Sequence, residues 1–224
     1  MNSRSDLVRA TVWARELAGD EVERALRGVS ERHFSKGNYL CHRGDRWDYW
    51  TGAVNGLVKM SSIARSGKAI TFAGIGAGGW FGEGSVLKDE PRKYDLVAIR
   101  DTHLLMMNRA TFFWLYENSV GFNRFLVRLL NERLAQFIAS TEYERLLDPK
   151  ARVARHLSWL CNPVLCPDVK GVVEITQEEL ALLAGVSRPV ANRSLQVLAD
   201  EGLVTVEHSR VIVADAERLG DYGA

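Results

Sequence analysis

The chain has 224 residues, a formal net charge of +1 and 25% charged residues. This length suits two modest domains, each able to bury its own core. The balanced charge excludes a basic nucleic-acid coat and an acidic disordered tail, so any nucleic-acid binding depends on where individual charges are placed.

The composition also favours a cytoplasmic protein. No segment approaches the roughly 20 apolar residues that a membrane-spanning helix needs, and the first residues lack the apolar run and cleavage site of a signal peptide. The three cysteines are too few and too odd in number for a disulfide framework, and the spacing of Cys161 and Cys166 is wider than that of a common metal motif. We therefore expect a soluble, cytoplasmic protein without a metal site and without membrane contact.

The first half of the chain shows two successive patterns of apolar residues. Residues 5–28 have apolar positions at helical spacing, which predicts one or two lead-in helices. From about residue 33 to residue 107, short apolar or alternating runs are separated by glycines. This rhythm predicts a compact antiparallel β-structure, a roll or a barrel.

Residues 119–147 contain no proline and, after Gly121, no glycine, while apolar residues recur every three or four positions. The pattern predicts one long helix, and a helix of about 29 residues spans over 40 Å and outruns one small domain. We expect it to form a dimer contact through Phe122, Leu126, Leu130 and Leu134. The alternative is a helix that packs only on its own domain.

Leu147-Asp148-Pro149 ends that helix and marks a hinge. Further on, Thr176 and Glu179 form a capping box, Gly185 allows a tight reversal, and Ser187 caps a second helix. The spacing is that of a helix-turn-helix. The closing VTVEHSRVIVAD predicts two short strands around His208 and Ser209, a wing whose His208 or Arg210 reaches a DNA backbone.

In such a motif, the start of the second helix faces the major groove of DNA. The residues expected there are Ser187, Arg188, Pro189, Asn192 and Arg193. Arginine bonds guanine in bidentate fashion, asparagine reads adenine, and a serine hydroxyl donates to phosphate. The segment from Gly185 to Leu198 holds two arginines and no acid. The alternative is an ordinary helical hairpin with solvated arginines.

Three motifs resemble the CRP/FNR family of bacterial transcription regulators, and the resemblance covers nearly the whole chain. The spacing F-x-K-G-x-x-L-x-x-x-G-D runs from Phe34 to Asp45. A cyclic-nucleotide phosphate-binding cassette is matched by Phe81-Gly82-Glu83-Gly84-Ser85, then Pro91-Arg92 and Val97-Ala98. The helix-turn-helix signature is matched from Gly185 through Arg193.

The resemblance implies an α+β fold: an N-terminal antiparallel β-roll of the cyclic-nucleotide-binding type, a long dimerisation α-helix and a C-terminal winged helix-turn-helix. The corresponding domains are 1–118, the effector-binding sensor with its N-terminal helices, 119–147, the dimerisation helix, and 148–224, the DNA-binding domain.

By the same resemblance, backbone N–H groups beside Gly82 and Glu83 cradle an anion, Glu83 accepts from ribose hydroxyls and Arg92 binds a cyclic phosphate, as in cAMP or cGMP. The expected effector-binding residues are Gly82, Glu83, Gly84, Ser85, Arg92, Lys93, Phe137 and Ile138. Three of them depart from the family pattern. Lys93 stands in place of a serine or threonine, and Phe137 and Ile138 stand where a polar pair reads the purine.

These departures keep a second effector class open. Phe137 and Ile138, with the tryptophans at 47, 50 and 80, would line an apolar site for an unidentified hydrophobic or aromatic effector. The plainer interpretation is that the tryptophans are core. Pro189 occupies the place of a base-reading glutamate, so the preferred operator should differ there.

The function implied is a homodimeric, allosteric transcription regulator that binds a palindromic double-stranded DNA operator, with RNA polymerase as a further partner, and that is not an enzyme. One alternative is a regulator of the same kind with a non-nucleotide effector or none. Another is a cyclic-nucleotide-binding module that acts on a protein partner.

Overall fold

The computed structural model describes residues 3–223. The N-terminal segment forms short helices, as expected, and Ser3 begins the first of them by accepting a hydrogen bond from the backbone N–H of Asp6. Trp13 is completely buried where these helices meet the rest of the sensor domain. The three elements are α1 (Arg4–Ala10), η1 (Trp13–Glu16) and α2 (Gly19–Gly28).

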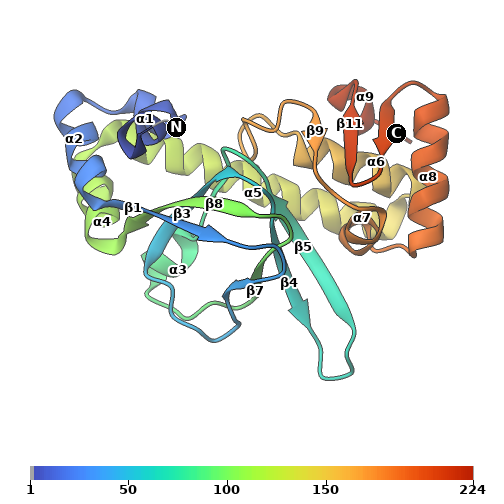
Figure 1. Cartoon of the computed structure of the whole chain (residues 1–224), viewed down its shortest axis with the longest axis horizontal. Coiled ribbons are helices and arrows are strands. Elements are labelled where there is room, and N and C mark those ends of the chain that lie inside the picture. The colour runs from blue at the N-terminus through green and yellow to red at the C-terminus, as the bar shows by residue number, and fades with distance from the viewer. Residues whose placement is uncertain (1–2, 224) are drawn as a thin grey trace.

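Two four-stranded antiparallel sheets follow, with orders β1-β8-β3-β6 and β2-β7-β4-β5. Their inner faces enclose an apolar core that includes Phe34, Phe81, Leu96 and Leu104, so the predicted antiparallel β-roll is confirmed. The β4–β5 hairpin projects from the roll (Figure 1). The strands are β1 (Val29–Phe34), β2 (Tyr39–Cys41), β3 (Tyr49–Asn55), β4 (Val58–Ile63), β5 (Ala69–Ile75), β6 (Trp80–Phe81), β7 (Asp95–Ala98) and β8 (Thr102–Asn108). Helix α3 (Glu83–Lys88) lies between β6 and β7.

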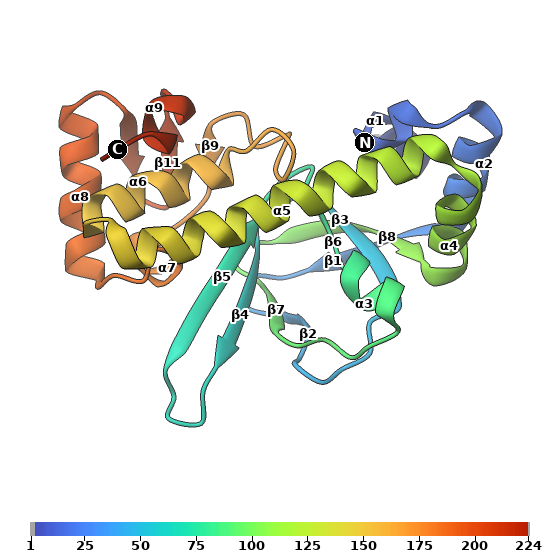
Figure 2. The ribbon, with the colours of Figure 1, turned by 180° about the vertical axis from the view of Figure 1, so that it is seen from behind.

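Helices α4 (Arg109–Asn118) and α5 (Val120–Leu146) come next. Ser119 separates them and caps α5 by accepting from the N–H of Phe122 over 3.1 Å. Helix α5 runs along most of the molecule, from the N-terminal helices to the C-terminal domain (Figure 2).

The predicted dimer stripe on α5 needs a correction. Phe122 and Leu126 are 0% and 3% exposed, because they pack into the core of their own chain with Leu129. Leu130 and Leu134 are 41% and 59% exposed. Apolar residues occur on both sides of this helix. The periodicity therefore predicted the helix, but the predicted stripe took residues from both its inward and its outward face.

The C-terminal domain is a winged helix-turn-helix. Asp148 caps its first helix by accepting from the N–H groups of Lys150 and Ala151, and Pro149 is the first helical residue. The wing strands pair antiparallel, and the reversal falls at His208 and Ser209 as predicted. The elements are α6 (Pro149–Leu160), β9 (Val172–Val173), α7 (Gln177–Ala184), α8 (Arg188–Asp200), β10 (Val204–Glu207), β11 (Arg210–Val213) and α9 (Ala216–Gly220).

The two domains of the chain share a packed boundary. Leu57 and Ile99 of the roll belong to the apolar cluster at the centre of the C-terminal domain. A Cβ at Gly74 would lie 2.6 Å from Leu160, so the backbone of β5 approaches α6 closely. The β-roll and the helix-turn-helix of one chain are therefore in direct contact.

Three further observations concern membrane spans, metal sites and the cysteine thiols. None of the helices within residues 3–223 is long and apolar enough to cross a membrane. In that same range, no group of three or more histidine, cysteine, aspartate or glutamate side chains is arranged to hold a metal ion. The three cysteines are free thiols, and burial raises the pKa of Cys41 and Cys161 to about 11.

Candidate effector and DNA-binding sites

The turn that joins β6 to α3 requires glycine. Gly82 is the N-cap of α3 and has φ +103°, a left-handed conformation that other residues rarely adopt. A Cβ there would lie 2.5 Å from Nη2 of Arg92 and 2.9 Å from the carbonyl oxygen of Tyr49. Both the backbone angle and the guanidinium packed against it therefore exclude a side chain at this position.

A buried acid and a buried base meet this turn. Glu83 is 5% exposed and Arg92 is 1% exposed. Nη1 of Arg92 donates to the hydroxyl of Tyr94 over 3.3 Å. Within the described part of the chain, Nε and Nη2 of Arg92 and Oε2 of Glu83 have no hydrogen-bond partner. Buried charged atoms without partners are rare, because they lose their hydration without compensation.

Helix α5 adds a third charged group. Nε of Arg133 lies 3.5 Å from Oε1 of Glu83, and its Nη2 donates to the carbonyl of Trp80 over 2.9 Å. The Arg133 side chain is only 12% exposed. Sequence reasoning missed this residue, although a signal was present: Arg133 continues the apolar inward stripe of Leu126 and Leu129, where a charged residue is unusual.

This arrangement suits a small anionic ligand that also carries hydroxyl groups. A guanidinium in a low-dielectric environment offers directed N–H donors to phosphate oxygens, and a carboxylate accepts from vicinal hydroxyls. Arg92 and Glu83 supply these two functions at the same turn, and Arg133 connects Glu83 to the long helix.

The outer residues of the predicted cassette are placed differently. Gly84 is exposed and Ser85 is half-buried. The side chain of Lys93 is 73% exposed and forms an ion pair with Glu90 at 2.8 Å, and a hydrogen bond from this lysine lowers the pKa of the Glu90 carboxyl. Lys93 therefore extends to the surface and pairs with Glu90, so its expected contact with the effector finds no support in this structure.

Phe137 and Ile138 also separate. Phe137 is half-buried and packs on the roll core together with Phe72 and Tyr94. Ile138 is 61% exposed. Neighbouring helical residues point about 100° apart, so the two side chains lie on different faces of α5, and the predicted effector contact of Ile138 finds no support within this chain.

The tryptophans form part of the core. The ring of Trp50 lies 4.2 Å from that of Trp80 and 5.5 Å from that of Trp13, centre to centre. Trp50 and Trp13 are 0% exposed, and Phe122 packs against both. This confirms packing as their role over the alternative of an apolar effector site.

The helix-turn-helix is held by its own caps. Thr176 and Glu179 form the predicted capping box, with the Thr176 hydroxyl accepting from the Glu179 N–H over 3.2 Å. Gly185 has φ +63° and ends α7. Ser187 is the N-cap of α8, although its side chain makes no capping hydrogen bond.

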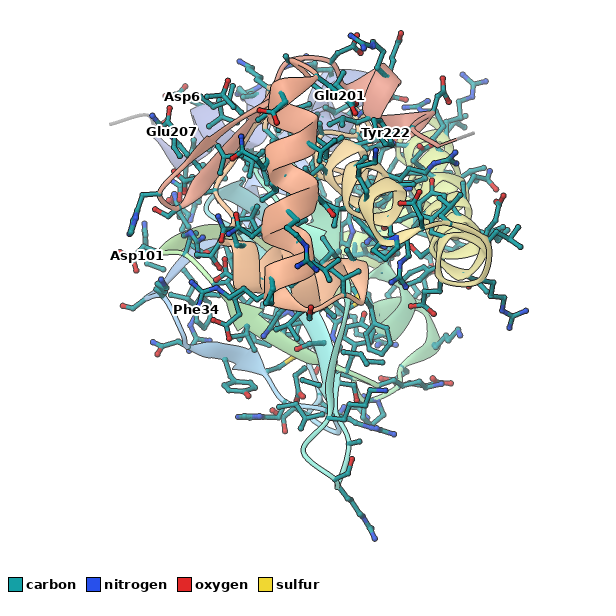
Figure 3. All side chains as sticks on the ribbon, turned by 90° about the vertical axis from the view of Figure 1, so that its right-hand side faces the viewer. Asp6, Phe34, Asp101, Glu201, Glu207 and Tyr222 are labelled. Carbon is teal, nitrogen blue, oxygen red and sulfur yellow. The ribbon has the colours of Figure 1, made fainter. Side chains whose placement is uncertain are left out.

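One face of α8 is exposed along the first two turns. Figure 3 looks onto this end of the molecule, with α8 in the foreground and Glu201 just beyond one end. Arg188 and Arg193 have no ion-pair partner among residues 3–223, so both guanidinium groups are available to a ligand. The exposed residues are Ser187, Arg188, Pro189, Asn192 and Arg193, which are those predicted to read DNA, and Gln196, which was not predicted.

The wing offers less uncompensated positive charge for DNA contact than α8 does. Nε of Arg210 donates to Glu207 over 2.5 Å, and this exposed hydrogen bond raises the pKa of Arg210. His208 is exposed at the reversal. The positive charge of Arg210 is thus partly compensated, whereas that of α8 is not.

A half-buried ion pair crosses the boundary between the two domains. Arg100, between β7 and β8, donates from Nη1 and Nη2 to the two carboxylate oxygens of Glu179, both over 2.9 Å. The side chains are 12% and 18% exposed. The same Glu179 Oε2 accepts from the N–H of Thr176, so the first turn of α7 is fixed to the sensor roll.

Comparison with known proteins defines the class of protein. A family model described as "Cyclic nucleotide-binding domain" matches residues 31–119, and one described as "Crp-like helix-turn-helix domain" matches residues 151–222. A β-roll sensor followed by a DNA-binding helix-turn-helix is the architecture of a transcription regulator.

Relatives define the family. The chain is 31% identical over 203 residues to the "Cyclic AMP receptor protein" of Thermus thermophilus, covering 91% of this chain and 92% of the relative. It is 27% identical over 190 residues to the "CRP-like cAMP-activated global transcriptional regulator" of Mycobacterium tuberculosis, covering 83% and 84%. The chain belongs to the CRP/FNR family of transcription regulators.

Solved structures share the fold. The catabolite activator protein of Thermus thermophilus matches with a TM-score of 0.50 at 28% identity, covering 97% of this chain and 100% of that one. FixK2 of Bradyrhizobium japonicum matches with a TM-score of 0.71 at 17% identity, covering 88% and 98%. The second likeness concerns the fold alone.

Proposed function

We propose that this protein is a homodimeric transcription regulator whose DNA affinity is controlled by a small effector held in the β-roll, a cyclic nucleotide such as cAMP or cGMP. The observation that carries the effector assignment is the buried pair of Glu83 and Arg92, which have unpartnered atoms and lie beside Gly82. The names of the two relatives, both of which refer to cyclic AMP, support the nucleotide class.

The homodimer is supported by the outward face of α5. Four large apolar side chains lie there at three- and four-residue spacing, which is the pattern of a helix seam. They are 41% to 61% exposed and comprise Val127, Leu130, Leu134 and Ile138. A seam of this length removes substantial apolar surface from water, at roughly 25 cal/mol per Å².

Allosteric control is supported by the position of Arg133. Its guanidinium contacts Glu83 on one side of α5, while Leu134, the next residue, lies on the exposed seam. A ligand between Arg92 and α5 displaces the helix and with it the helix pair. Such a ligand needs only a few kcal/mol of differential affinity to shift the population of the DNA-binding form.

The DNA target is a palindromic double-stranded operator. In a two-fold dimer, the exposed faces of two α8 helices enter successive major grooves about 34 Å apart. Arg188 and Arg193 read guanine and contact phosphate, and Asn192 reads adenine. Recruitment of RNA polymerase would then convert DNA binding into regulation.

The test of the effector site is calorimetric titration of the purified dimer with cAMP and with cGMP. Arg92→Ala should weaken binding at least about 100-fold, since it removes a buried charge-assisted contact. The matched control is Lys93→Ala, which removes the neighbouring cation that points outward, and it should change affinity less than about threefold. Equal effects of the two substitutions would contradict the site.

The test of the DNA site is selection of operators from a random library, followed by affinity measurement. Replacing Arg188 and Arg193 by alanine should abolish sequence-specific binding, and Arg145→Ala, on exposed α5, should not. Unchanged operator affinity would favour the other class of function, a module that acts on a protein partner.

A second effector class is supported by one observation. Phe137, Phe72 and Tyr94 each pack against the roll core, and the aromatic Tyr94 adjoins Arg92. A regulator with a non-nucleotide effector, or one that needs no effector, would show no heat with either nucleotide yet would still bind its operator.

A further inference from the structure

The C-terminal domain is attached to the rest of its chain at two places. One is the hinge after α5, where Tyr143 packs on α6 and its hydroxyl accepts a hydrogen bond from Nε1 of Trp159 over 3.3 Å. The other is the boundary with the β-roll, which includes the bidentate pair of Arg100 and Glu179. A single attachment leaves a domain free to turn about it, so the second attachment determines the orientation of the domain.

Much of the boundary with the roll is apolar. Leu57, Val97 and Ile99 of the roll belong to the apolar cluster that also contains Leu180 and Leu183 of α7. The hydrophobic effect stabilises this contact in proportion to the buried area and has no preferred direction. The apolar surfaces therefore hold the two domains together, but they restrict the angle between them less than directed hydrogen bonds do.

Directed contacts across this boundary reach two different parts of the C-terminal domain. The loop between α6 and β9 is held by hydrogen bonds such as the one from the N–H of Gly76 to Sγ of Cys166, over 3.3 Å. Within residues 3–223, only the pair of Arg100 and Glu179 connects the roll to a helix of the helix-turn-helix through hydrogen bonds. The orientation of that motif therefore depends on this pair.

Both members of the pair are themselves held in place. The carbonyl of Arg100 accepts from the hydroxyl of Thr102, at the start of β8, over 2.7 Å. The Glu179 carboxylate also accepts from the N–H of Thr176 in the capping box of α7, over 2.8 Å. Two parallel N–H···O bonds between a planar guanidinium and a carboxylate specify an angle as well as a distance. The pair therefore fixes the direction of α7 relative to the roll.

Helix α7 transmits this direction to α8. The N–H of Val186 donates to the carbonyl of Ala181 over 2.9 Å and closes the turn between the helices, and both helices contribute to one apolar cluster. The exposed face of α8, with Arg188 and Arg193, therefore keeps one orientation relative to the roll of its own chain. In a two-fold dimer, this orientation sets the separation of the two reading helices.

We propose that Arg100 is a positioning residue for DNA recognition: by holding Glu179, it fixes the half-site spacing that the dimer accepts in its operator. This inference rests on the proposed function, because it assumes a homodimer and a palindromic operator. One base pair corresponds to about 3.4 Å and about a tenth of a helical turn. A dimer with fixed domains rejects a half-site that is shifted by this amount, whereas domains that turn about the hinge follow it.

The test compares operators that differ only in the number of base pairs between their half-sites. The operator that the full-length wild type selects from a random library is lengthened or shortened by one central base pair. Affinities are measured with and without saturating cAMP, so that an effector requirement does not hide binding. The spacing ratio is the affinity for the selected operator divided by that for a shifted one. In the wild type it should be at least about 10, because one reading helix loses its register.

Removing either member of the pair should lower the spacing ratio. In Arg100→Gln it should fall below about 3, because the helix-turn-helix is then free to adjust its angle. Glu179→Gln, which keeps an acceptor for the Thr176 N–H, should lower the ratio to the same extent. The double variant should lower it no further, because the two substitutions remove one shared constraint.

The matched control is Arg9→Gln, which removes an exposed arginine–glutamate pair within the N-terminal helices and should keep the wild-type spacing ratio. A purely structural role for Arg100 would weaken binding to all operators equally and leave the ratio unchanged, which overturns the inference while DNA reading by α8 stands. A wild type that binds all spacings equally also overturns it. A wild type that selects no palindromic operator overturns both the proposed DNA target and this inference.

Discussion

The ion pair between Arg100 and Glu179 should couple the stability of the two domains. Its two hydrogen bonds of 2.9 Å are bidentate, and the side chains are only 12% and 18% exposed. Exposed pairs contribute at most about 1 kcal/mol, whereas hydrogen bonds to charged groups contribute about 1.5 to 3 kcal/mol. We expect a coupling free energy of about 2 kcal/mol, in the lower part of the second range.

The measurement is a double-mutant cycle of Arg100→Gln and Glu179→Gln, with the free energy of unfolding taken from denaturant titration of tryptophan fluorescence. Glutamine at 179 still reaches the N–H of Thr176, so the capping box survives and the cycle isolates the pair. A coupling free energy below about 0.3 kcal/mol at pH 7 would refute the reasoning, because that is the additivity expected of independent sites.

The coupling should also depend on pH. Burial raises the pKa of Glu179, but the Arg100 guanidinium and the Thr176 donors outweigh it, so the pKa lies below its usual 4.5. A carboxyl with a depressed folded-state pKa stabilises the protein above its unfolded pKa, and this stability is lost as the pH falls through the folded value. The coupling free energy should therefore be constant from pH 7 to about 5 and vanish in more acidic solution.

Three further predictions concern single positions. Leu134→Glu on the exposed seam should convert the dimer to monomers in sedimentation analysis, and a dimer that persists in this variant would contradict the seam. Phe122→Ala, in contrast, should lower the free energy of unfolding by about 3 to 5 kcal/mol, because it leaves a cavity in the core. Gly82→Ala should abolish effector binding, because the new Cβ strains the backbone and clashes with the Arg92 guanidinium. Gly84→Ala, where a Cβ meets nothing within 4 Å, should bind the effector normally. Equal loss of binding in both variants would argue against a role for the tight packing at Gly82. Burial, and to a lesser extent the neighbouring Arg152, lowers the pKa of His156 from 6.5 to about 4. The free energy of unfolding that this neutral histidine contributes is therefore fully present above pH 6.5 and should fall by about 2 kcal/mol between pH 7 and pH 5. His156→Gln should lose this pH dependence, and a variant that keeps it would contradict the assignment to His156.

Local signals in the chain were sufficient for several features. The capping box at Thr176, the left-handed turn at Gly185 and the proline after Asp148 act within a few residues of themselves. The long helix followed from uninterrupted periodicity. These features depend on backbone geometry that neighbouring residues determine, so the sequence predicted them without knowledge of the fold. Gly82 was predicted by the resemblance to the family's cassette motif.

Other features required the tertiary arrangement. Glu83 and Arg133 lie far apart in the chain, as do Arg100 and Glu179, and no local pattern indicates that they meet. Arg133 is unusual in the apolar stripe of α5, but only the packing of the roll against α5 shows that its partner is Glu83.

The two sides of α5 show the division most clearly. Sequence alone determined that residues 119–147 form an amphipathic helix and that a helix-turn-helix follows it, because caps, turns and periodicity are local properties. The cassette that precedes the helix was predicted by the resemblance to the family. Only the tertiary structure decided that Phe122 faces inward and Leu134 outward, that Lys93 is exposed, and that Gln136 is buried. When a helix has apolar residues on both faces, its sequence does not indicate which face is buried in its own domain. The surface against which the helix packs determines that face.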